Sequence, residues 1–333
     1  MIVCRRSAQD PKVHQFLREN SPGFYNRREW FCVLQEGFKA PVLCYCLEED
    51  EKIYLALPGI ILDFRIMRMF YSNIPYGGFV GEMEYLSGFL ALLEKSFKED
   101  HVHFIRIAKD SRTQFPEPEG YLKEMAFTHL LDLDGMTEES LWANYKKRVR
   151  RDVRKAEKSG ITVHEANDLR EIDVLFDIYL ETMKRNEAYN TWTKKALYAI
   201  YDHLVQKGEA KILLAKLKDE IIAGIILIFS PETTYYFFAA SSQKNLSLCP
   251  NDLLVHHGIC LTIAAKRRFL DLMASQREDV ALMNFKEKWG AQKQPFYFYE
   301  KSLSSFRTWL WRRAWWMMNT AWGACLLRWW RRR

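Results

Sequence analysis

The stretch LWANYKKRVRRDVRKAEKSGI, residues 141–161, lies near the middle of the chain and combines an apolar stripe with many cations. Its apolar residues recur three or four positions apart: Leu141, Tyr145, Val149, Val153 and Ala156. That spacing places them on one face of a helix. Ser140 offers an N-terminal cap and Gly160 a C-terminal one, so the sequence predicts a basic amphipathic helix over residues 141–159.

Charge alone does not assign a task to this helix, because a run of Lys and Arg is typical of a solvated helix face. Its position is more informative, since it lies between two halves with α/β patterning and ends in a strand-like run at 161–166. A basic helix at a domain junction is well placed to hold an anionic substrate. We expect Arg148, Arg151 and Arg154, spaced by three, to bind that substrate.

The second half of the chain alternates helical and strand-like periods in a regular order. The strand at 161–166 is followed by two helices, a meander of three strands, and then helix, strand, helix and strand. The ranges predicted after that first strand are 168–187, 193–206, 211–217, 221–230, 233–241, 252–267, 269–273, 280–289 and 296–301. This order resembles an acyltransferase fold of the GNAT type, which implies an α/β (α+β) fold class.

The first half of the chain is less regular. The elements predicted there are a helix at 10–19, strands at 30–35, 40–46 and 52–57 that begin an antiparallel sheet, a helix at 84–97, and strands at 103–108 and 128–133. The loop IPYGGFVG, residues 74–81, has one proline and three glycines. It is either a tight loop or, through the backbone of Gly77 and Gly78, one wall of a substrate cleft.

A chain of 333 residues with 48% hydrophobic residues can fill two cores, and we place the domains at 1–135 and 136–303, before a tail at 304–333. The formal charge of +7 belongs to this tail, because residues 302–333 contain seven arginines and no Asp, Glu or Lys. Seven scattered cysteines without a CxxC motif fit a reducing compartment. The charged N-terminus lacks the apolar core of a signal peptide, so we expect a cytoplasmic protein.

Several segments together resemble one known family. They are RVRRDVRKAEKSGITV (148–163), YYFFAAS (235–241), PNDLLVHHGI (250–259), FLDLM (269–273) and FKEKWGAQ (285–292). As a set they resemble the second domain of the Fem family of peptidoglycan-bridge aminoacyltransferases and related Fem-like N-acyltransferases, and the loop IPYGGFVG is similar to a loop in their first domain. The resemblance covers most of residues 25–301. It implies two tandem GNAT-type domains that transfer an amino acid or acyl group to an amine.

The resemblance also implies a catalytic residue and has one departure. A lysine near the C-terminal end of the second domain acts at the reacting carbonyl in Fem-like enzymes, and Lys286 is the matching residue. From the residues alone, Lys286 can equally point to solvent while Phe285 and Trp289, four apart, enter the core. After FLD the family often carries glycines, whereas this chain has Leu272, Met273 and Ala274.

Four further residues have a functional and a structural interpretation. Tyr235 and Tyr236 can line the substrate cleft or belong to the core of a strand. Asp252 is a further candidate for substrate binding. With His256, four residues later, it can form a proton relay, although a simpler role for Asp252 is to cap the helix.

Coenzyme-A users of the GNAT fold hold the pyrophosphate on the backbone N–H groups of a glycine-rich loop before a helix. In this chain that place reads SSQKNLSLCPND, residues 241–252, with no glycine. The resemblance therefore makes aminoacyl-tRNA the leading donor, with acyl-coenzyme A as the alternative, and no cofactor is expected. No metal is expected either, because the sequence places no further ligand near His101 and His103.

The tail interleaves aromatic and basic residues, and we expect it to form an amphipathic Trp/Arg helix. Such a helix suits the headgroup region of an anionic membrane. Its apolar run at 314–327 is too short to span a bilayer. The residues expected at the membrane are Trp309, Arg312, Trp315, Trp316, Trp322, Arg328, Trp329 and Trp330. Binding of RNA, or docking as a buried helix, are the alternatives.

Three functions follow from these observations. The first is an N-acyltransferase at the inner face of the cell membrane that moves an amino acid from aminoacyl-tRNA to an amine of an anionic cell-envelope precursor. A nucleotide- or lipid-linked peptidoglycan precursor is an example of that acceptor. The second is an acyl-thioester-dependent N-acyltransferase acting on an amino sugar or polysaccharide precursor. The third is a non-catalytic binding protein with the same fold at the membrane.

Overall fold

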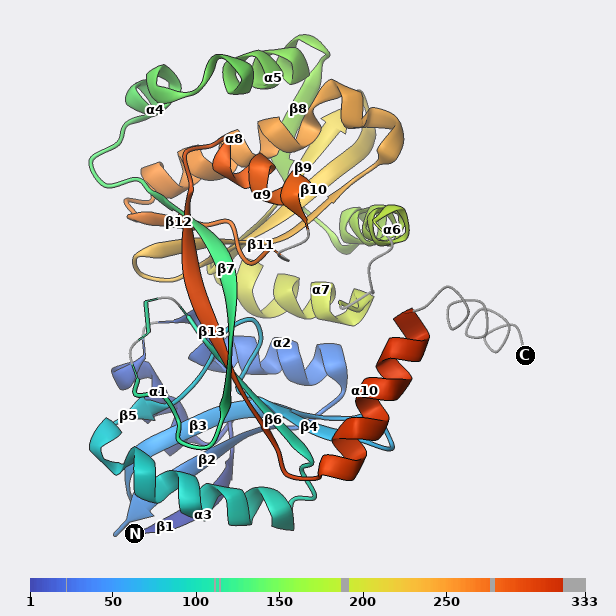
Figure 1. Cartoon of the computed structure of the whole chain (residues 1–333). Coiled ribbons are helices and arrows are strands. Elements are labelled where there is room, and N and C mark those ends of the chain that lie inside the picture. Colours follow the sequence, from blue (N-terminus) through green and yellow to red (C-terminus); the bar gives the residue numbers. More distant parts are fainter. Residues whose placement is uncertain (22, 111, 114, 187–191, 276–278, 320–333) are drawn as a thin grey trace. The chain divides into compact units, whose positions relative to one another are not determined.

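The computed structural model describes residues 1–21, 23–110, 112–113, 115–186, 192–275 and 279–319 (Figure 1). The chain forms two compact units, each assembled from separate stretches of sequence. Unit 1 comprises Met1–Asn20, Ala40–Glu124 and the chain from Tyr297 onward, and unit 2 comprises Ser21–Lys39 and Met125–Phe296. The predicted domains are uninterrupted stretches instead, and their limits stay a prediction.

The strands of unit 1 follow the order β1-β2-β3-β4-β6-β13, with β5 paired to β3. Neighbours run antiparallel apart from β4 and β6, which are parallel. The bounds are β1 (Ile2–Ser7), β2 (Val42–Glu49), β3 (Lys52–Asp63), β4 (Arg68–Tyr71), β5 (Val80–Gly81), β6 (Phe104–Lys109) and β13 (Gln292–Ser302). Helices α1 (Pro11–Asn20), α3 (Leu86–Glu99) and α10 (Ser305–Asn319) belong to the same unit.

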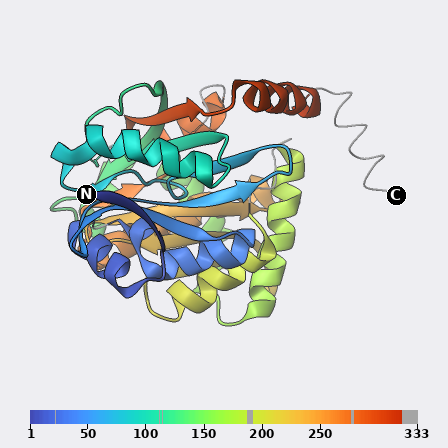
Figure 2. The same ribbon diagram turned by 90° about the horizontal axis from the view of Figure 1, so that it is seen from below.

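The core of unit 1 lies between its sheet and α3. Phe89, Leu93 and Phe97, four residues apart on α3, are buried against Phe70 and Ile105 of the sheet. At the end of the sheet β13 passes directly into α10 (Figure 2). The described part of the C-terminal segment is therefore helical, in line with the predicted C-terminal helix.

Unit 2 repeats the same plan with the strand order β7-β12-β11-β10-β9-β8. Here β11 and β12 are the parallel pair. The bounds are β7 (Leu122–Asp132), β8 (Ile161–Glu165), β9 (Ala210–Leu217), β10 (Glu220–Phe229), β11 (Thr233–Ser241) and β12 (Phe269–Asp271). The boundary between the units falls within β7 and within β13.

The helices of unit 2 cover this second sheet. They are α2 (Arg28–Phe38), α4 (Glu138–Asn144), α5 (Lys147–Lys158), α6 (Leu169–Arg185), α7 (Lys194–Ile200) with a π-helical turn (Tyr201–Val205), α8 (Pro250–Ala264) and α9 (Val280–Glu287). Figure 1 shows α5 beside α8, and Val149 and Val153 of α5 are buried in the same core as Leu254 and Ile259 of α8. The mixed α/β fold class is confirmed, and the predicted meander is present as β9, β10 and β11.

The sequence predicted one basic helix over 141–159, but the structure has two helices there, α4 and α5. Tyr145 adopts an extended conformation at the break, and its hydroxyl is hydrogen-bonded to His256 Nδ1 at 3.1 Å. Thr137 caps α4, in a capping box with Ser140. Gly160, with φ +79°, follows the end of α5 as predicted for a C-terminal cap.

The strand predicted at 30–35 is also wrong, because these residues lie in helix α2 of unit 2. Trp30, Val33, Leu34 and Gly37 face inward, and a Cβ on Gly37 would lie 2.7 Å from the Cβ of Ala196 on α7. This spacing of three and four is helical. A short apolar run fits both periods, and tertiary packing decided between them.

Candidate functional site

The parallel pair of unit 2 opens at one end. Strands β11 and β12 pair only from Thr233 to Tyr235 and from Phe269 to Asp271. Beyond this point β12 has ended, while β11 continues to Ser241. Three buried charged side chains lie in this region: Asp252 in the first turn of α8, Asp271 at the end of β12 and Lys286 in the last turn of α9. The half-buried Lys288, just after α9, pairs with Asp252.

Lys286 is the most deeply buried of the candidate cations, with 5% of its surface exposed. Its ammonium donates hydrogen bonds to the carbonyl oxygens of Met273 (2.8 Å) and Ala274 (2.9 Å). Burial lowers the pKa of Lys286 to about 8, against the opposing effects of Asp271 and Asp279. A protonated lysine has three N–H groups, and among the described residues only these two bonds are formed, which leaves the third N–H for a substrate oxygen. The solvent-facing interpretation of Lys286 is therefore wrong.

The carbonyls that hold Lys286 come from an unusual turn after β12. Met273 has φ +64°, a left-handed conformation that favours glycine, at a place where Fem-like proteins often carry glycine. The buried Asp271 carboxylate fixes this turn by accepting a hydrogen bond from the Met273 amide at 2.8 Å. Asp271 also accepts one from the Thr128 hydroxyl. Met273 thus adopts a backbone conformation that glycine favours, at a position where the sequence resemblance implied glycine.

Asp252 does not cap α8, contrary to the simpler expectation. The N-terminal cap position is Cys249, with φ +62°, and Pro250 begins the helix. Asp252 lies buried in the first turn and forms an ion pair with Lys288. Burial raises the pKa of this carboxyl, against the charge of Lys288. The N-terminus of α8, where a pyrophosphate would bind, thus holds one of the protein's own carboxylates.

The proton relay between Asp252 and His256 is also wrong. His256 Nδ1 faces the Tyr145 hydroxyl at 3.1 Å, whereas Asp252 pairs with Lys288. Burial lowers the pKa of His256 to about 4, so the ring stays neutral near pH 7. These two residues face different partners because tertiary contacts, and not their spacing on the helix, decide their orientation.

The two tyrosines of β11 point to opposite faces of the strand, as alternate residues do. Tyr235 is buried, and its ring centroid lies 4.9 Å from that of Phe24 within unit 2. Tyr236 packs against the core that contains α5 and α8, and burial, followed by the charge of Asp252, raises its pKa. Only Tyr236 therefore lies on the side of Asp252.

The cations of α5 form a groove of about 690 Å³ that we call the basic groove. It is lined by Lys147, Arg150, Arg151, Arg154, Lys155, Lys158 and Ser159. Arg148 is outside this lining, although it was predicted with Arg151 and Arg154. Three residues rotate by about 300° on a helix, so successive steps of three drift around it by roughly 60° each. The lining of the groove therefore includes Arg151 and Arg154 and leaves out Arg148, although Arg148 and Arg151 both approach the carboxylate of Asp152.

Some of the arginine side chains of α5 contact other residues of α4 and α5. Arg151 Nη2 lies 2.9 Å from an oxygen of Asp152, and Arg148 Nε lies 3.7 Å from the other oxygen. The Arg154 guanidinium lies 5.3 Å from the centre of the Trp142 ring on α4. The break between α4 and α5 thus places an aromatic face beside the basic groove.

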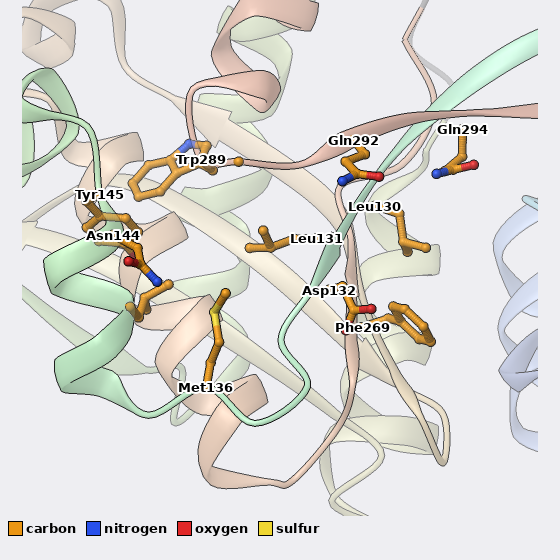
Figure 3. Close-up of a pocket in the computed structure, with 12 residues that line it drawn as sticks. Leu130, Leu131, Asp132, Met136, Asn144, Tyr145, Phe269, Trp289, Gln292 and Gln294 are labelled. Atoms are coloured by element: carbon orange, nitrogen blue, oxygen red, sulfur yellow. The ribbon is translucent and has the colours of Figure 1, made fainter.

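A cavity of about 340 Å³ lies elsewhere in unit 2 and was not predicted (Figure 3). It is lined by Leu130, Leu131, Asp132, Met136, Leu141, Asn144, Tyr145, Phe269, Trp289, Gly290, Gln292 and Gln294. The buried Trp289 Nε1 has no hydrogen-bond partner among the described residues. Hydrophobic spacing alone had indicated only that Trp289 belongs to the core.

His129 was not predicted as a site residue, and it lies beside Lys286. Its ring is fully buried, and both ring nitrogens lack a hydrogen bond within the described chain. The nearest acid is Glu287, whose Oε1 lies 3.6 Å from Nε2. Burial, then the charge of Lys286, lowers the pKa of His129, so it is neutral near pH 7. Nothing in the sequence pattern around His129, the strand-like run THLLDL, indicated that it would lie at the site.

In unit 1 the predicted Gly77 and Gly78 lie in a tightly packed loop. The Gly77 amide donates to the Ala108 carbonyl at 2.8 Å, and a Cβ on Gly77 would lie 1.5 Å from the Ser72 carbonyl oxygen. Gly78 has φ +120°, and a Cβ there would lie 2.4 Å from the Phe115 ring. Packing alone therefore requires both glycines. Their role in substrate binding stays a prediction.

The predicted membrane residues are only partly described. Trp309 and Arg312 are exposed on α10. Trp315 and Trp316 lie within the helical backbone of α10, and Trp322, Arg328, Trp329 and Trp330 lie outside the described residues. No described helix is both long and apolar enough to cross a membrane. In the same part of the chain, no group of three His, Cys, Asp or Glu side chains is placed to bind a metal.

Comparisons with known proteins agree with this fold. Residues 143–287 match the family described as an acetyltransferase (GNAT) domain. A comparison with curated protein sequences finds no match.

Solved structures with a similar fold cover nearly the whole chain. FemX shares 16% identity with a TM-score of 0.62, over 89% of this chain and 97% of its own. L-PGS from Bacillus licheniformis shares 12% with a TM-score of 0.60, over 91% and 95%. A tandem GNAT protein from the clavulanic acid biosynthesis pathway shares 10% with a TM-score of 0.60, over 90% and 98%.

The family match contains β11, α8, β12 and Lys286, which are the elements of the site in unit 2. The fold of the chain is that of FemX and tandem GNAT proteins, as the sequence resemblance implied. Residues 143–287 thus match the GNAT acetyltransferase domain family, and the chain as a whole has the fold of FemX and of tandem GNAT proteins.

Proposed function

We propose that this chain is an N-acyltransferase that moves an amino acid from aminoacyl-tRNA to an amine of an anionic cell-envelope precursor, such as a peptidoglycan precursor. The observation that carries the proposal is Lys286, a buried ammonium fixed on two backbone carbonyls within the GNAT domain. Buried charges are costly unless they are paired, so such a lysine is a strong candidate for a functional group.

The chemistry assigned to Lys286 is stabilisation of negative charge on the acyl oxygen. The acceptor amine attacks the ester carbon, a C–N bond forms, and the C–O bond to the tRNA ribose breaks. The proton lost by the amine passes to the leaving ribose oxygen. Lys286 remains protonated throughout and donates its free N–H to the oxyanion, an interaction that is strengthened by exclusion of water.

The choice of donor rests on the N-terminus of α8. The preceding segment has no glycine, and it forms a 3₁₀ turn (Gln243–Leu248) followed by Cys249 at φ +62°. The Asp252 carboxylate, paired with Lys288, occupies the first turn of α8, where a pyrophosphate would bind. These features support a donor without a pyrophosphate arm bound there, and aminoacyl-tRNA fits that description.

The basic groove on α5 supplies the complementary charge for an anionic substrate. Six of its seven lining residues are cations. Arginine side chains suit phosphate because the guanidinium presents paired donors. We assign Arg151 and Arg154 to the phosphates of the donor or the acceptor, with no cofactor. The exposed Trp309 and Arg312 support a location at the inner, cytoplasmic face of the membrane.

A second candidate is transfer from an acyl thioester to an amino sugar or polysaccharide precursor. The match of residues 143–287 to an acetyltransferase family favours it. One structural neighbour, the tandem GNAT protein, is named as a form without AcCoA, which is an acyl thioester. The third candidate is a non-catalytic binding protein. In such a protein the buried charge of Lys286 would have no function.

One experiment separates these candidates. Labelled aminoacyl-tRNA is mixed with a nucleotide- or lipid-linked muropeptide, with and without ribonuclease, beside a parallel reaction with labelled acyl-coenzyme A. Transfer that ribonuclease abolishes supports the proposal, whereas transfer only from the thioester selects the second candidate. Absence of transfer in both reactions, with substrate binding retained, selects the binding protein.

A further inference from the structure

Helix α10 of unit 1 has a docked face and an outward face. On the docked face, Thr308 is buried and shares a 2.7 Å hydrogen bond with Ser302. Trp311 packs against a small cluster that contains Met67 and Phe104. On the outward face, Phe306 is 71% exposed and Trp309 55% exposed, with their rings stacked at 6.5 Å. A tethered helix thus displays aromatic rings to solvent.

The turn between β3 and β4 borders this helix and was not singled out in the sequence. Phe64 and Ile66 are each 40% exposed at the tip of the turn. The Phe64 ring lies 4.8 Å from the Trp311 ring. Arg307 Nη1 donates a 2.9 Å hydrogen bond to the Ile66 carbonyl, which ties the turn to α10. The exposed side chains of the turn and of α10 therefore belong to one contiguous surface of unit 1.

This surface, which we call the aromatic-basic surface, carries an excess of positive charge. Its apolar members are Phe64, Ile66, Phe306 and Trp309, and its cations are Arg65, Arg307, Arg312 and Arg313. The one acid in the turn, Asp63, accepts a hydrogen bond from the Arg65 amide and lies 3.6 Å from Arg68. The Arg313 guanidinium lies 5.6 Å from the Trp309 ring centre.

We infer that the aromatic-basic surface docks the folded unit on an anionic lipid bilayer, with the turn at 64–66 inserting beside α10. Exposed aromatic and aliphatic groups enter the headgroup boundary, while arginines extend to lipid phosphates. The aliphatic Ile66 favours lipid over RNA, because it offers no flat face for stacking on a base. The inference deepens the membrane location in the proposed function, and it assigns part of the anchor to the folded unit.

The test uses the full chain and vesicle flotation. The vesicles are phosphatidylcholine alone or phosphatidylcholine mixed with phosphatidylglycerol. The test variant is Phe64→Ser with Ile66→Ser. The matched control is Leu92→Ser with Leu122→Ser, which removes two exposed apolar side chains elsewhere in unit 1. Thermal unfolding must show that both variants are folded.

The wild type is expected to prefer the anionic vesicles, and the test variant to lose roughly tenfold or more in affinity, while the control binds like the wild type. Unchanged binding of the test variant would overturn the inference, as would an equal loss in the control. So would a loss confined to single-stranded RNA, measured in parallel. Vesicle binding does not depend on acyl transfer, so its failure is distinguishable from failure of the proposed enzymatic activity.

Discussion

The two units share a strand order and differ in what occupies the end of their parallel pair. In unit 1 the glycine loop continues beyond β4 and β6, and Gly77 pairs with Lys109 on the backbone. The rings of Phe79 and Phe115 close the loop at 5.4 Å. In unit 2 the corresponding end holds Asp252, Lys286 and their partners. The same topology thus yields a packed end in one unit and a buried cluster of charges in the other, and we assign the chemistry to unit 2.

The largest effect should come from removing the buried lysine of unit 2. Lys286→Met is expected to lower kcat for acyl transfer by about 10²–10³-fold, because an oxyanion donor is lost. The matched change in unit 1 is Lys109→Met, whose ammonium donates to the Phe115 carbonyl at 2.7 Å and whose pKa is lowered by burial. It should leave kcat within a few-fold of wild type. Equal losses in the two variants would remove the distinction between the units.

A steric change should break unit 1 without touching the chemistry of unit 2. Gly77→Ala places a Cβ 1.5 Å from the Ser72 carbonyl oxygen, and the loop must move. The free energy of unfolding should fall by about 3 kcal/mol or more. Gly88→Ala on α3 is the control, because its Cβ would meet nothing within 4 Å. Chemical denaturation measures both, and a Gly77→Ala protein of wild-type stability would show that the loop is not tightly packed.

The basic groove provides a smaller effect that sharpens the assignment within unit 2. Arg151→Ala with Arg154→Ala should raise KM for the anionic substrate by roughly tenfold with little change in kcat, because phosphate contacts are lost. Arg148→Ala is the control, since Arg148 does not line the groove. Steady-state kinetics at two salt concentrations measure these changes. If Arg148→Ala had the larger effect, the groove would not be the binding surface.

The smallest effect concerns the strained turn that holds Lys286. Met273→Gly should raise the free energy of unfolding by about 1 kcal/mol, because glycine accepts φ +64° without strain. Ala274→Gly, next to it, should lower that free energy, because Ala274 lies outside the left-handed region. Denaturant titration compares the two. Destabilisation by Met273→Gly would show that the Met273 side chain contributes more than its backbone strain costs.

Much of the secondary structure of unit 2 was predictable because its hydrophobic residues recur at regular intervals. The meander of β9 to β11 and the helices α6 and α8 followed from alternating and three-to-four spacing. The break at Tyr145 was not predictable, because it depends on His256, 111 residues away. Strands β1 and β4 and the exchange of segments between units likewise depend on pairing across the chain.

For the site, sequence comparison supplied Lys286, but its environment came only from the structure. The carbonyls of Met273 and Ala274, the Asp252–Lys288 ion pair and His129 are brought together from separate elements. Spacing along one helix suggested a relay between Asp252 and His256, and tertiary contacts gave each a different partner. Local pattern thus identified residues, whereas burial and long-range contacts determined their chemistry.

The most direct test of the assignment to Lys286 is the pH dependence of kcat/KM for acyl transfer. The active form is the ammonium, and burial lowers its pKa to about 8, so activity should fall as the pH rises through about 8. Titration of the acceptor amine affects wild type and Lys286→Met alike, so the residual activity of the variant is the reference. The account predicts that the falling limb is present in wild type and absent in Lys286→Met. A ratio of wild-type to Lys286→Met activity that stays constant or rises through pH 8 would contradict it.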